Sequence, residues 1–146
     1  MTLVAFDFDG TLADSEMMDR LAARHGVGAE VADITDRAMR GELSYAESLR
    51  ERASLVAGLP SEDAADVYAD VRLRDGAGDL LSRLTDSGVR VVVLTGGFGP
   101  GVEAALDAAG VSVDRVVANS LPEADGELTG DVEGPLIEGT KDDALA

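Results

Sequence analysis

The stretch Ala5-Phe6-Asp7-Phe8-Asp9-Gly10-Thr11-Leu12 decides how the rest of the sequence is interpreted. It overlaps the short apolar run Leu3–Phe6, and Gly10 and Thr11 then turn the chain. A short apolar run that ends at a glycine-containing turn is typical of a buried parallel strand. Two carboxylates are therefore expected at the carboxyl end of a strand, which is where open α/β sheets bind ligands.

Asp7 and Asp9 are two residues apart, so in a strand both side chains face the same side. Two adjacent carboxylates repel each other unless a divalent cation lies between them or one of them keeps a proton. Taken alone, the pair fits a catalytic or metal site and equally a solvated strand end in an acidic chain. The wider sequence has to separate these two interpretations.

Length and composition indicate one modest domain. The chain has 146 residues, of which 45% are hydrophobic, and it has no cysteine, which excludes disulfides and thiolate chemistry. We expect no signal peptide, because the N-terminal apolar run is short and reaches Asp7 almost at once. No stretch approaches the length that spans a membrane. These features predict a cytoplasmic protein.

The charge is strongly negative. The formal net charge is -17, from 29 acidic and 12 basic residues, and the acids are spread along the chain. Such a charge argues against binding to nucleic acids or to anionic membranes. Lys141 is the only lysine beside eleven arginines. An acidic, lysine-poor surface suggests a salt-loving organism, in which salt screens the self-repulsion, although a GC-rich genome also explains the arginine and alanine usage.

The first half of the chain is predicted to be helical after the opening strand. Amphipathic spacing favours four helices, at about 16–24, 29–40, 45–57 and 61–71. Asp14 and Ser15 are the expected cap of the first helix, and Ser44 with Glu47 forms a capping box before the third. The helices should form a small cap, residues 14–75, inserted after the first strand.

Strands and helices alternate in the second half, which implies a parallel sheet. A helix around Leu80–Leu84 precedes a buried strand at 89–94, and Pro100 opens a helix that ends at Gly110. A third strand is expected at 114–118. Asp125-Gly126 predicts a hairpin turn between extended pieces at 119–121 and 128–132.

Thr95 and Gly96 directly follow the second buried strand. A hydroxyl and glycine amides at such a turn can cradle a phosphate, because glycine lets the backbone approach closely. A Thr-Gly-Gly sequence is also an ordinary turn, so this signal is weak by itself.

Together these motifs resemble the haloacid dehalogenase-like hydrolases. Asp-x-Asp-Gly-Thr-Leu after an N-terminal strand matches the first motif of that family, Thr95-Gly96 the second, and Lys141 the third. The resemblance implies an α/β fold with a Rossmann-like parallel sheet core, residues 1–13 and 76–146, and the inserted cap. It implies that Asp7 is the nucleophile, that Asp9 is the general acid and base, that both bind Mg2+, and that Lys141 lies beside the transferring phosphoryl group.

A further set of strings runs along nearly the whole chain: Glu16, Arg40–Arg52, Thr95–Phe98, Ala118-Asn119 and Leu128–Pro135. This series resembles the phosphoserine phosphatases. The resemblance implies that Glu16 pairs with the substrate ammonium, that Arg52 grips the carboxylate, and that Met39 and Tyr45 line the closing pocket. Without the resemblance, Glu16 fits a helix N-terminus and Arg52 fits an i,i+4 partner of Ser48 or a solvated arginine.

Two features depart from the family pattern. Thr95 stands where the family usually has Ser, which keeps the hydroxyl. The family continues past its lysine with two more βα units, the first carrying a Gly-Asp-Gly-x-x-Asn-Asp-like motif that completes the Mg2+ site, and this sequence has no such string. Asp142 and Asp143 are not expected to replace it. We therefore expect weaker metal binding and a first strand with a bare edge, completed by self-association or by a missing C-terminal segment.

The predicted function is Mg2+-dependent hydrolysis of O-phospho-L-serine through an aspartyl-phosphate, in serine biosynthesis. One alternative is a phosphatase or phosphotransferase that acts on another small phosphomonoester. A second is a non-catalytic remnant that binds phosphate or a partner chain, which the absent motif favours. A response-regulator-like phospho-acceptor also carries acids at strand ends, but the inserted helices and the Thr-Gly-Gly-Phe string argue against it.

Overall fold

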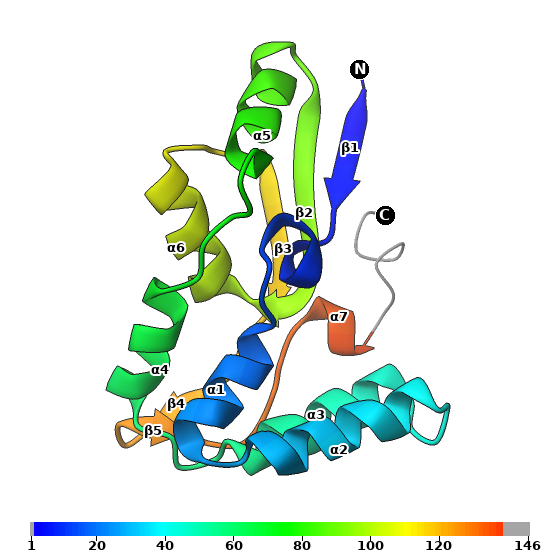
Figure 1. The fold of residues 1–146 in the computed structure, drawn as a ribbon, viewed down its shortest axis with the longest axis vertical. Coiled ribbons are helices and arrows are strands. Elements are labelled where there is room, and N and C mark those ends of the chain that lie inside the picture. The colour runs from blue at the N-terminus through cyan, green and yellow to red at the C-terminus, as the bar shows by residue number, and fades with distance from the viewer. Residues whose placement is uncertain (1, 139–146) are drawn as a thin grey trace.

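The computed structural model of the protein describes residues 2–138. Three parallel strands form its sheet in the order β1-β2-β3, with β1 at Leu3–Phe6, β2 at Arg90–Phe98 and β3 at Arg115–Asn119. Strand β2 is central and buried over almost its whole length, as its apolar run from Val91 to Leu94 predicts. The three carboxyl ends therefore lie at one edge of the sheet, and the parallel α/β core is confirmed (Figure 1).

Two helices cover one face of this sheet. Helix α5 spans Ala77–Asp86 and contacts β2, and α6 spans Gly99–Ala109 and contacts both β2 and β3. Pro100 lies in the first turn of α6, where its missing N–H costs nothing, as predicted. A short helix, α7 at Pro135–Glu138, contacts the strands near their carboxyl ends (Figure 1).

The cap lies beyond the carboxyl ends of the strands (Figure 1). Its helices are α1 at Met17–His25, α2 at Gly28–Met39, α3 at Tyr45–Leu55 and α4 at Ser61–Ala69. They confirm the four predicted helices, with ends that differ by a few residues.

Helix N-termini in the cap are only partly as expected. The capping box before α3 is present, with Ser44 Oγ accepting from Glu47 N and Glu47 Oε1 accepting from Ser44 N, each at 3.1 Å. The predicted Asp14 and Ser15 cap is wrong. Glu16 is the N-cap residue of α1, without a side-chain capping bond, and the N–H of Met17 donates to Asp9 instead, at 3.4 Å. A tertiary contact from the turn after β1 thus replaces the local cap.

The hairpin turn is where the sequence predicts it, but its strands are shorter. Asp125 and Gly126 both have positive φ, as a tight hairpin turn needs, and they join β4 at Glu123–Ala124 to β5 at Glu127–Leu128. The predicted pieces at 119–121 and 128–132 form no strand pair in the described residues, and the nearby bridge joins Ser120 to Glu133, just beyond the second piece. The hairpin bonds instead to the segment between α3 and α4, for example through Gly58 N donating to Leu128 O at 2.9 Å.

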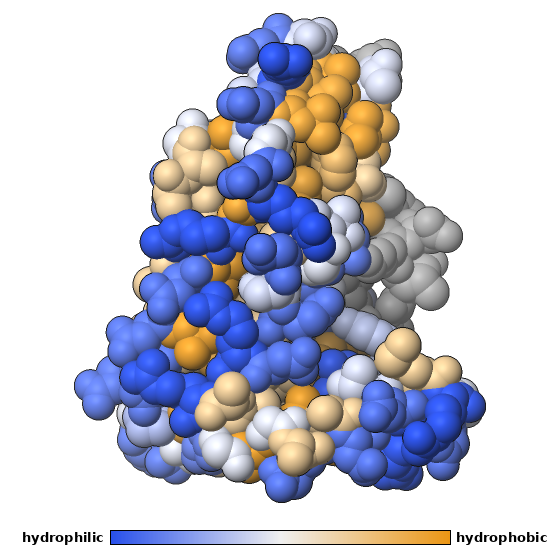
Figure 2. Space-filling view, viewed as in Figure 1, coloured by the Kyte–Doolittle hydropathy of each residue, from blue (hydrophilic) through white to orange (hydrophobic). Residues whose placement is uncertain are grey.

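Strand β1 lies at the edge of the sheet within the described residues, which confirms that expectation. Leu3 is 45% exposed, and apolar surface gathers at the top of the molecule where β1 and β2 begin (Figure 2). In the part of the chain that the structure describes, no helix is both long and apolar enough to cross a membrane.

Candidate active site

Asp7 and Asp9 are placed by the turn that ends β1. Asp7 directly follows the strand, and its Oδ1 accepts from the N–H of Phe8 at 2.8 Å, which fixes the orientation of the carboxylate. The turn that follows, η1 at Phe8–Leu12, is closed by Ala13 N donating to Phe8 O at 3.0 Å. Gly10 in this turn has a φ of 72°, which only glycine adopts easily. The turn leaves Asp7 exposed and Asp9 half-buried.

Asp9 lies in an environment that favours its neutral form. Burial, the largest cause, and the charges of Glu16, Asp7 and Asp19 together raise its pKa to about 7, although the N–H of Met17 acts to lower it. Its Oδ2 accepts from that N–H, while its Oδ1 is buried with no hydrogen-bond partner in the described residues. A carboxyl with a pKa near neutrality can both donate and accept a proton, as a general acid and base must.

The turn at the end of β2 lies directly beside these acids. A Cβ atom added at Gly97 would lie 2.8 Å from Asp9 Oδ2 and 2.9 Å from Met17 Cε, so only glycine fits there. Thr95 is fully buried, and its Oγ1 accepts from the N–H of Gly97 at 2.9 Å. No described residue accepts the hydroxyl hydrogen of Thr95. The structure thus brings the predicted acids and the predicted phosphate turn together.

Tyr45 reaches from the cap into this site. It is the first residue of α3, and a Cβ atom added at Gly96 would overlap its hydroxyl oxygen. Burial raises the pKa of Tyr45, and the charges of Asp7, Asp9 and Glu16 act in the same direction, opposed by Arg52. Its ring remains 49% exposed. The hydroxyl end of Tyr45 therefore lies between the cap and the sheet, among the charged groups of the site.

Glu16 and Arg52 approach the site from two cap helices. The pKa of Glu16 is raised by burial and by the charges of Asp19 and Asp7, and it is lowered by the charge of Arg52. Arg52 Nε donates to the carbonyl of Ser48 at 3.3 Å, which is the i,i+4 partnership that its helix position suggests. The negative Glu16 and the positive Arg52 therefore lie near the acids on the cap side, and Arg52 is also bonded to the backbone of its own helix.

Met39, which was predicted to line the pocket, is not part of this arrangement. Met39 is 82% exposed at the end of α2, so it contributes to the surface here rather than to a pocket wall. Lys141, Asp142 and Asp143 lie outside the described residues.

Sequence reasoning assigned no role to two buried polar residues. Ser48 on α3 and Asn119 at the end of β3 are 1% and 2% exposed. Ser48 Oγ and Asn119 Oδ1 have no hydrogen-bond partner in the described part of the chain. For Asn119 a signal existed, because a polar residue that ends a buried parallel strand lies at the ligand-binding edge of the sheet.

The described residues could hold part of a divalent-cation site. The Asp7 carboxylate and the oxygens of Asp9, whose Oδ1 is buried with no hydrogen-bond partner in the described residues, are hard oxygen ligands of the kind that such a cation prefers. Residues 2–138 contain no cluster of three or more His, Cys, Asp or Glu side chains that could hold a metal. The arrangement therefore fits a cation held by two acidic residues, with water or phosphate oxygens completing its shell.

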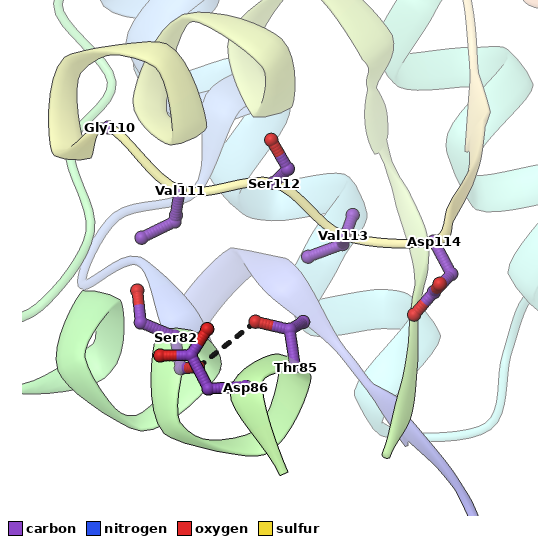
Figure 3. Close-up of a pocket in the computed structure, with 8 residues that line it drawn as sticks. All are labelled: Ser82, Thr85, Asp86, Gly110, Val111, Ser112, Val113 and Asp114. Atoms are coloured by element: carbon purple, nitrogen blue, oxygen red, sulfur yellow. Dashed lines mark hydrogen bonds between the residues drawn. The ribbon is translucent and has the colours of Figure 1, made fainter. Parts of the chain in front are cut away.

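The cavity in Figure 3 lies away from these residues. It has a volume of about 330 Å3 and is lined by the end of α5 and by residues 110–114. Asp114 in its wall accepts from the N–H of Val91, near the start of β2, at 2.6 Å. The cavity is thus at the amino ends of the strands, opposite the acids.

Comparison with known proteins identifies the family of the chain. The family model of the haloacid dehalogenase-like hydrolases matches residues 4–146. The chain belongs to this family of hydrolases. A curated relative, the phosphoserine phosphatase of Halobacterium salinarum, is 78% identical over 99% of the chain, and that of Streptococcus thermophilus is 42% identical over 99%. Within the hydrolase family, the chain groups with the phosphoserine phosphatases.

Solved structures of this hydrolase group share the fold. A phospho-aspartyl intermediate analogue of phosphoserine phosphatase aligns with a TM-score of 0.83, at 39% identity over 93% of this chain. A substrate-bound phosphoserine phosphatase complex also aligns at 0.83, with 38% identity. The chain spans 69% of the Halobacterium relative, 65% of the Streptococcus relative and 64% of each of these two structures.

Proposed function

We propose that this hydrolase cleaves O-phospho-L-serine to serine and phosphate through an aspartyl-phosphate on Asp7. The carrying observation is that the acids after β1, the Thr95–Gly97 segment in the last part of β2 and the oppositely charged Glu16 and Arg52 of the cap converge on one place. The similarity to a phospho-aspartyl intermediate analogue and to a substrate-bound phosphatase supports the same reaction.

Asp7 acts as the nucleophile. A carboxylate oxygen of Asp7 attacks phosphorus, the bond from phosphorus to the seryl oxygen breaks, and an acyl phosphate forms. Its hydrogen bond from Phe8 N holds the carboxylate at the strand end, where the entering phosphoryl group meets it. The orientation is set before substrate arrives, which lowers the entropic part of the barrier.

Asp9 moves the proton in both steps. Its raised pKa keeps it protonated near neutrality, so it gives that proton to the departing seryl oxygen. The carboxylate then takes a proton from the water that attacks the aspartyl-phosphate, which releases phosphate and regenerates Asp7. The tight contact of Gly97 with Asp9 keeps this carboxyl next to the phosphate turn.

The cap supplies recognition of the amino-acid part of the substrate. Arg52 pairs with the carboxylate and Glu16 pairs with the ammonium, so a phosphorylated amino acid matches the two charges together. Tyr45 closes over Gly96 and excludes water from the phosphoryl group. We further propose that Lys141 neutralises charge on that group, as the family's third motif implies.

We propose Mg2+ as the cofactor, bound by the Asp7 carboxylate and the backbone carbonyl of Asp9, which leaves the Asp9 carboxyl free to transfer protons. When bound, Mg2+ screens the repulsion between the acids and the phosphate oxygens. The small-molecule substrate is the expected partner, and the cytoplasmic location stays a prediction from the sequence.

The decisive test is phosphate release from L-phosphoserine by the purified chain, with Mg2+ or with EDTA, in low and in molar salt. Asp7→Asn is the control for contaminating phosphatase. We expect Mg2+-dependent release that falls at least about 1,000-fold in Asp7→Asn. A folded chain that releases no phosphate under any of these conditions would contradict the proposal for the chain by itself and would favour the phosphate-binding remnant.

The substrate assignment has its own test. Arg52→Gln should raise KM for phosphoserine at least about 10-fold, while it should leave KM for p-nitrophenyl phosphate, which has no carboxylate, within twofold. Equal effects on both substrates would show that Arg52 supports the helix through Ser48, and would favour another phosphomonoester as substrate.

A further inference from the structure

The Gly96–Gly97 peptide is held at both of its polar atoms. Asn119 Nδ2 donates to the carbonyl oxygen of Gly96 at 3.3 Å, and the N–H of Gly97 donates to Thr95 Oγ1 at 2.9 Å. These two bonds fix the rotation of one peptide plane. A peptide between two glycines would otherwise rotate at little cost, since neither residue has a side chain that limits φ and ψ.

The sheet itself does not hold this peptide. In the pairing of β2 with β3, Leu94 lies opposite Val117 and Phe98 lies opposite Asn119. An advance of four residues along β2 therefore corresponds to an advance of only two residues along β3. The segment between Leu94 and Phe98 therefore bulges out of the regular ladder. The side-chain amide of Asn119 takes the place of the ladder bond that the bulge removes.

Asn119 is kept in place by its surroundings. Its side chain is 2% exposed, and a Cβ atom added at Gly134 would overlap its Oδ1. The flanking backbone is also fixed, because Ser120 and Glu133 exchange two hydrogen bonds of 2.8 and 2.9 Å. Burying the Asn119 amide costs free energy, because its Oδ1 has no partner in the described residues. Such a cost suggests that the Nδ2 group, which donates to Gly96, serves a function.

We propose that Asn119 is a positioning residue, which locks the Gly96–Gly97 peptide so that the Thr95 hydroxyl faces the transferring phosphoryl group and the Gly96 carbonyl oxygen stays turned away from it. With the lock in place, Thr95 Oγ1 accepts from the N–H of Gly97 and directs its own hydrogen outward as a donor. Without it, the peptide can flip and turn the Gly96 carbonyl oxygen toward the phosphate. A flipped peptide places an acceptor beside an anion and frees the Thr95 hydroxyl to rotate, which removes stabilisation that is largest in the transition state.

The role of Asn119 rests on the proposed function, but the lock can be measured without activity. Asn119→Asp keeps the shape of the side chain and removes the donor to Gly96. The matched control is Ser120→Ala, which changes the next, exposed residue. For both variants and the wild-type chain, amide hydrogen exchange is measured by NMR at Gly97 and at Val93 in the regular part of β2, and kcat and KM are measured with phosphoserine.

We expect exchange at Gly97 to be at least about 10-fold faster in Asn119→Asp, with Val93 unchanged and Ser120→Ala like the wild type. We expect kcat to fall about 10- to 100-fold, with KM within about threefold, because a preorganised donor acts mainly on the transition state. Inhibition by orthovanadate, a mimic of the five-coordinate phosphorus, should weaken by the same factor as kcat.

The outcomes separate the two proposals. Unchanged exchange at Gly97 in Asn119→Asp would overturn the lock, whatever the activity. Faster exchange with wild-type kcat would overturn its role in positioning the phosphate turn. Faster exchange in a chain whose wild type releases no phosphate from phosphoserine would uphold the lock and reject the proposed function.

Discussion

Asp9 is a half-buried acid beside three other carboxylates, those of Asp7, Glu16 and Asp19. Its pKa of about 7 means that the folded chain without metal holds a proton that the unfolded chain, near the ordinary value of 3.8, releases. Ionisation of Asp9 therefore opposes folding. The free energy of unfolding should fall as the pH rises from about 4 to about 7, because over this range the unfolded chain releases the proton of Asp9 and the folded chain keeps it.

The first prediction follows from that linkage. Asp9→Asn should be more stable than the wild type at pH 7.5 in EDTA, by as much as about 4 kcal/mol at 1.36 kcal/mol per pKa unit, and nearly equal to it at pH 4. Urea unfolding at a series of pH values, in EDTA, measures the difference. A stability difference that does not grow as the pH rises would show that Asp9 ionises normally in the fold.

The second prediction concerns the contact between Gly96 and Tyr45. Gly96→Ala should push the Tyr45 hydroxyl away, because the new methyl group would occupy its position. Since Tyr45 is half-exposed and can swing outward, we expect a cost in stability below about 1 kcal/mol but a loss of kcat/KM of at least about 10-fold. Thermal unfolding and steady-state kinetics test the two parts.

Tyr45→Phe in the Gly96→Ala background identifies the cause of that loss. Phenylalanine lacks the overlapping oxygen, so the double variant should recover part of the lost kcat/KM. If the double variant is no better than Gly96→Ala, the loss comes from the glycine backbone and not from the contact with the cap.

At the scale of elements, the cap and the core are joined through α1 and α6. Met17, the first residue of α1, is fully buried and lies against Gly101 in the first turns of α6. Val71, which follows α4, packs against Gly101 too: its Cγ2 atom would lie 3.3 Å from a Cβ atom added at that glycine. Because α6 directly follows the phosphate turn, this packing sets where the cap stands above the site.

The third prediction compares two glycines of α6. Gly101→Ala should lower the free energy of unfolding by about 1–3 kcal/mol, since the methyl group meets the buried sulfur of Met17 and overpacks the core. Gly99→Ala, where nothing lies within 4 Å, should stay within about 0.5 kcal/mol of the wild type. Urea unfolding of the two variants is the measurement. Equal effects would show that helix propensity, and not packing, governs α6.

The whole molecule carries a net charge of -17 on 146 residues. Among the described residues, the ion pairs are those of Arg20, Arg24 and Arg40, each with acids near the surface. Surface pairs of this kind contribute little to stability. Because the chain has 29 acidic and only 12 basic residues, the acids repel one another, and this repulsion acts against the folded state at low ionic strength.

The fourth prediction is that salt stabilises the fold. Between 0.05 M and 1 M KCl the Debye length shrinks to about 3 Å, so the melting temperature should rise by at least about 5 °C. A variant with the exposed Glu51, Glu62 and Glu103 changed to Gln should melt higher at low salt and gain less from KCl. A melting temperature that is flat or falls with KCl, or an equal gain in both proteins, would contradict this account.

Local sequence signals predicted most of the fold. The apolar run of β2, the capping box at Ser44 and the glycines that end helices act over a few residues, so they are visible without tertiary structure. The pairing of Ser120 with Glu133 and the docking of the hairpin on the segment before α4 were not predictable, because they join backbone groups far apart in the chain. The N-cap of α1 failed for the same reason, since Asp9 supplies the acceptor.

The sequence by itself indicated which residues could carry the chemistry, because Asp7, Asp9 and Thr95 each follow an apolar run that is typical of a buried strand, and together they resemble the hydrolase motifs. Only the tertiary structure decided how they act. It buried Asp9 among other acids and so raised its pKa to about 7, and it placed Tyr45 on Gly96 and Asn119 against the same turn. Desolvation and contact depend on what lies nearby in space, and neighbours in space are distant in the sequence.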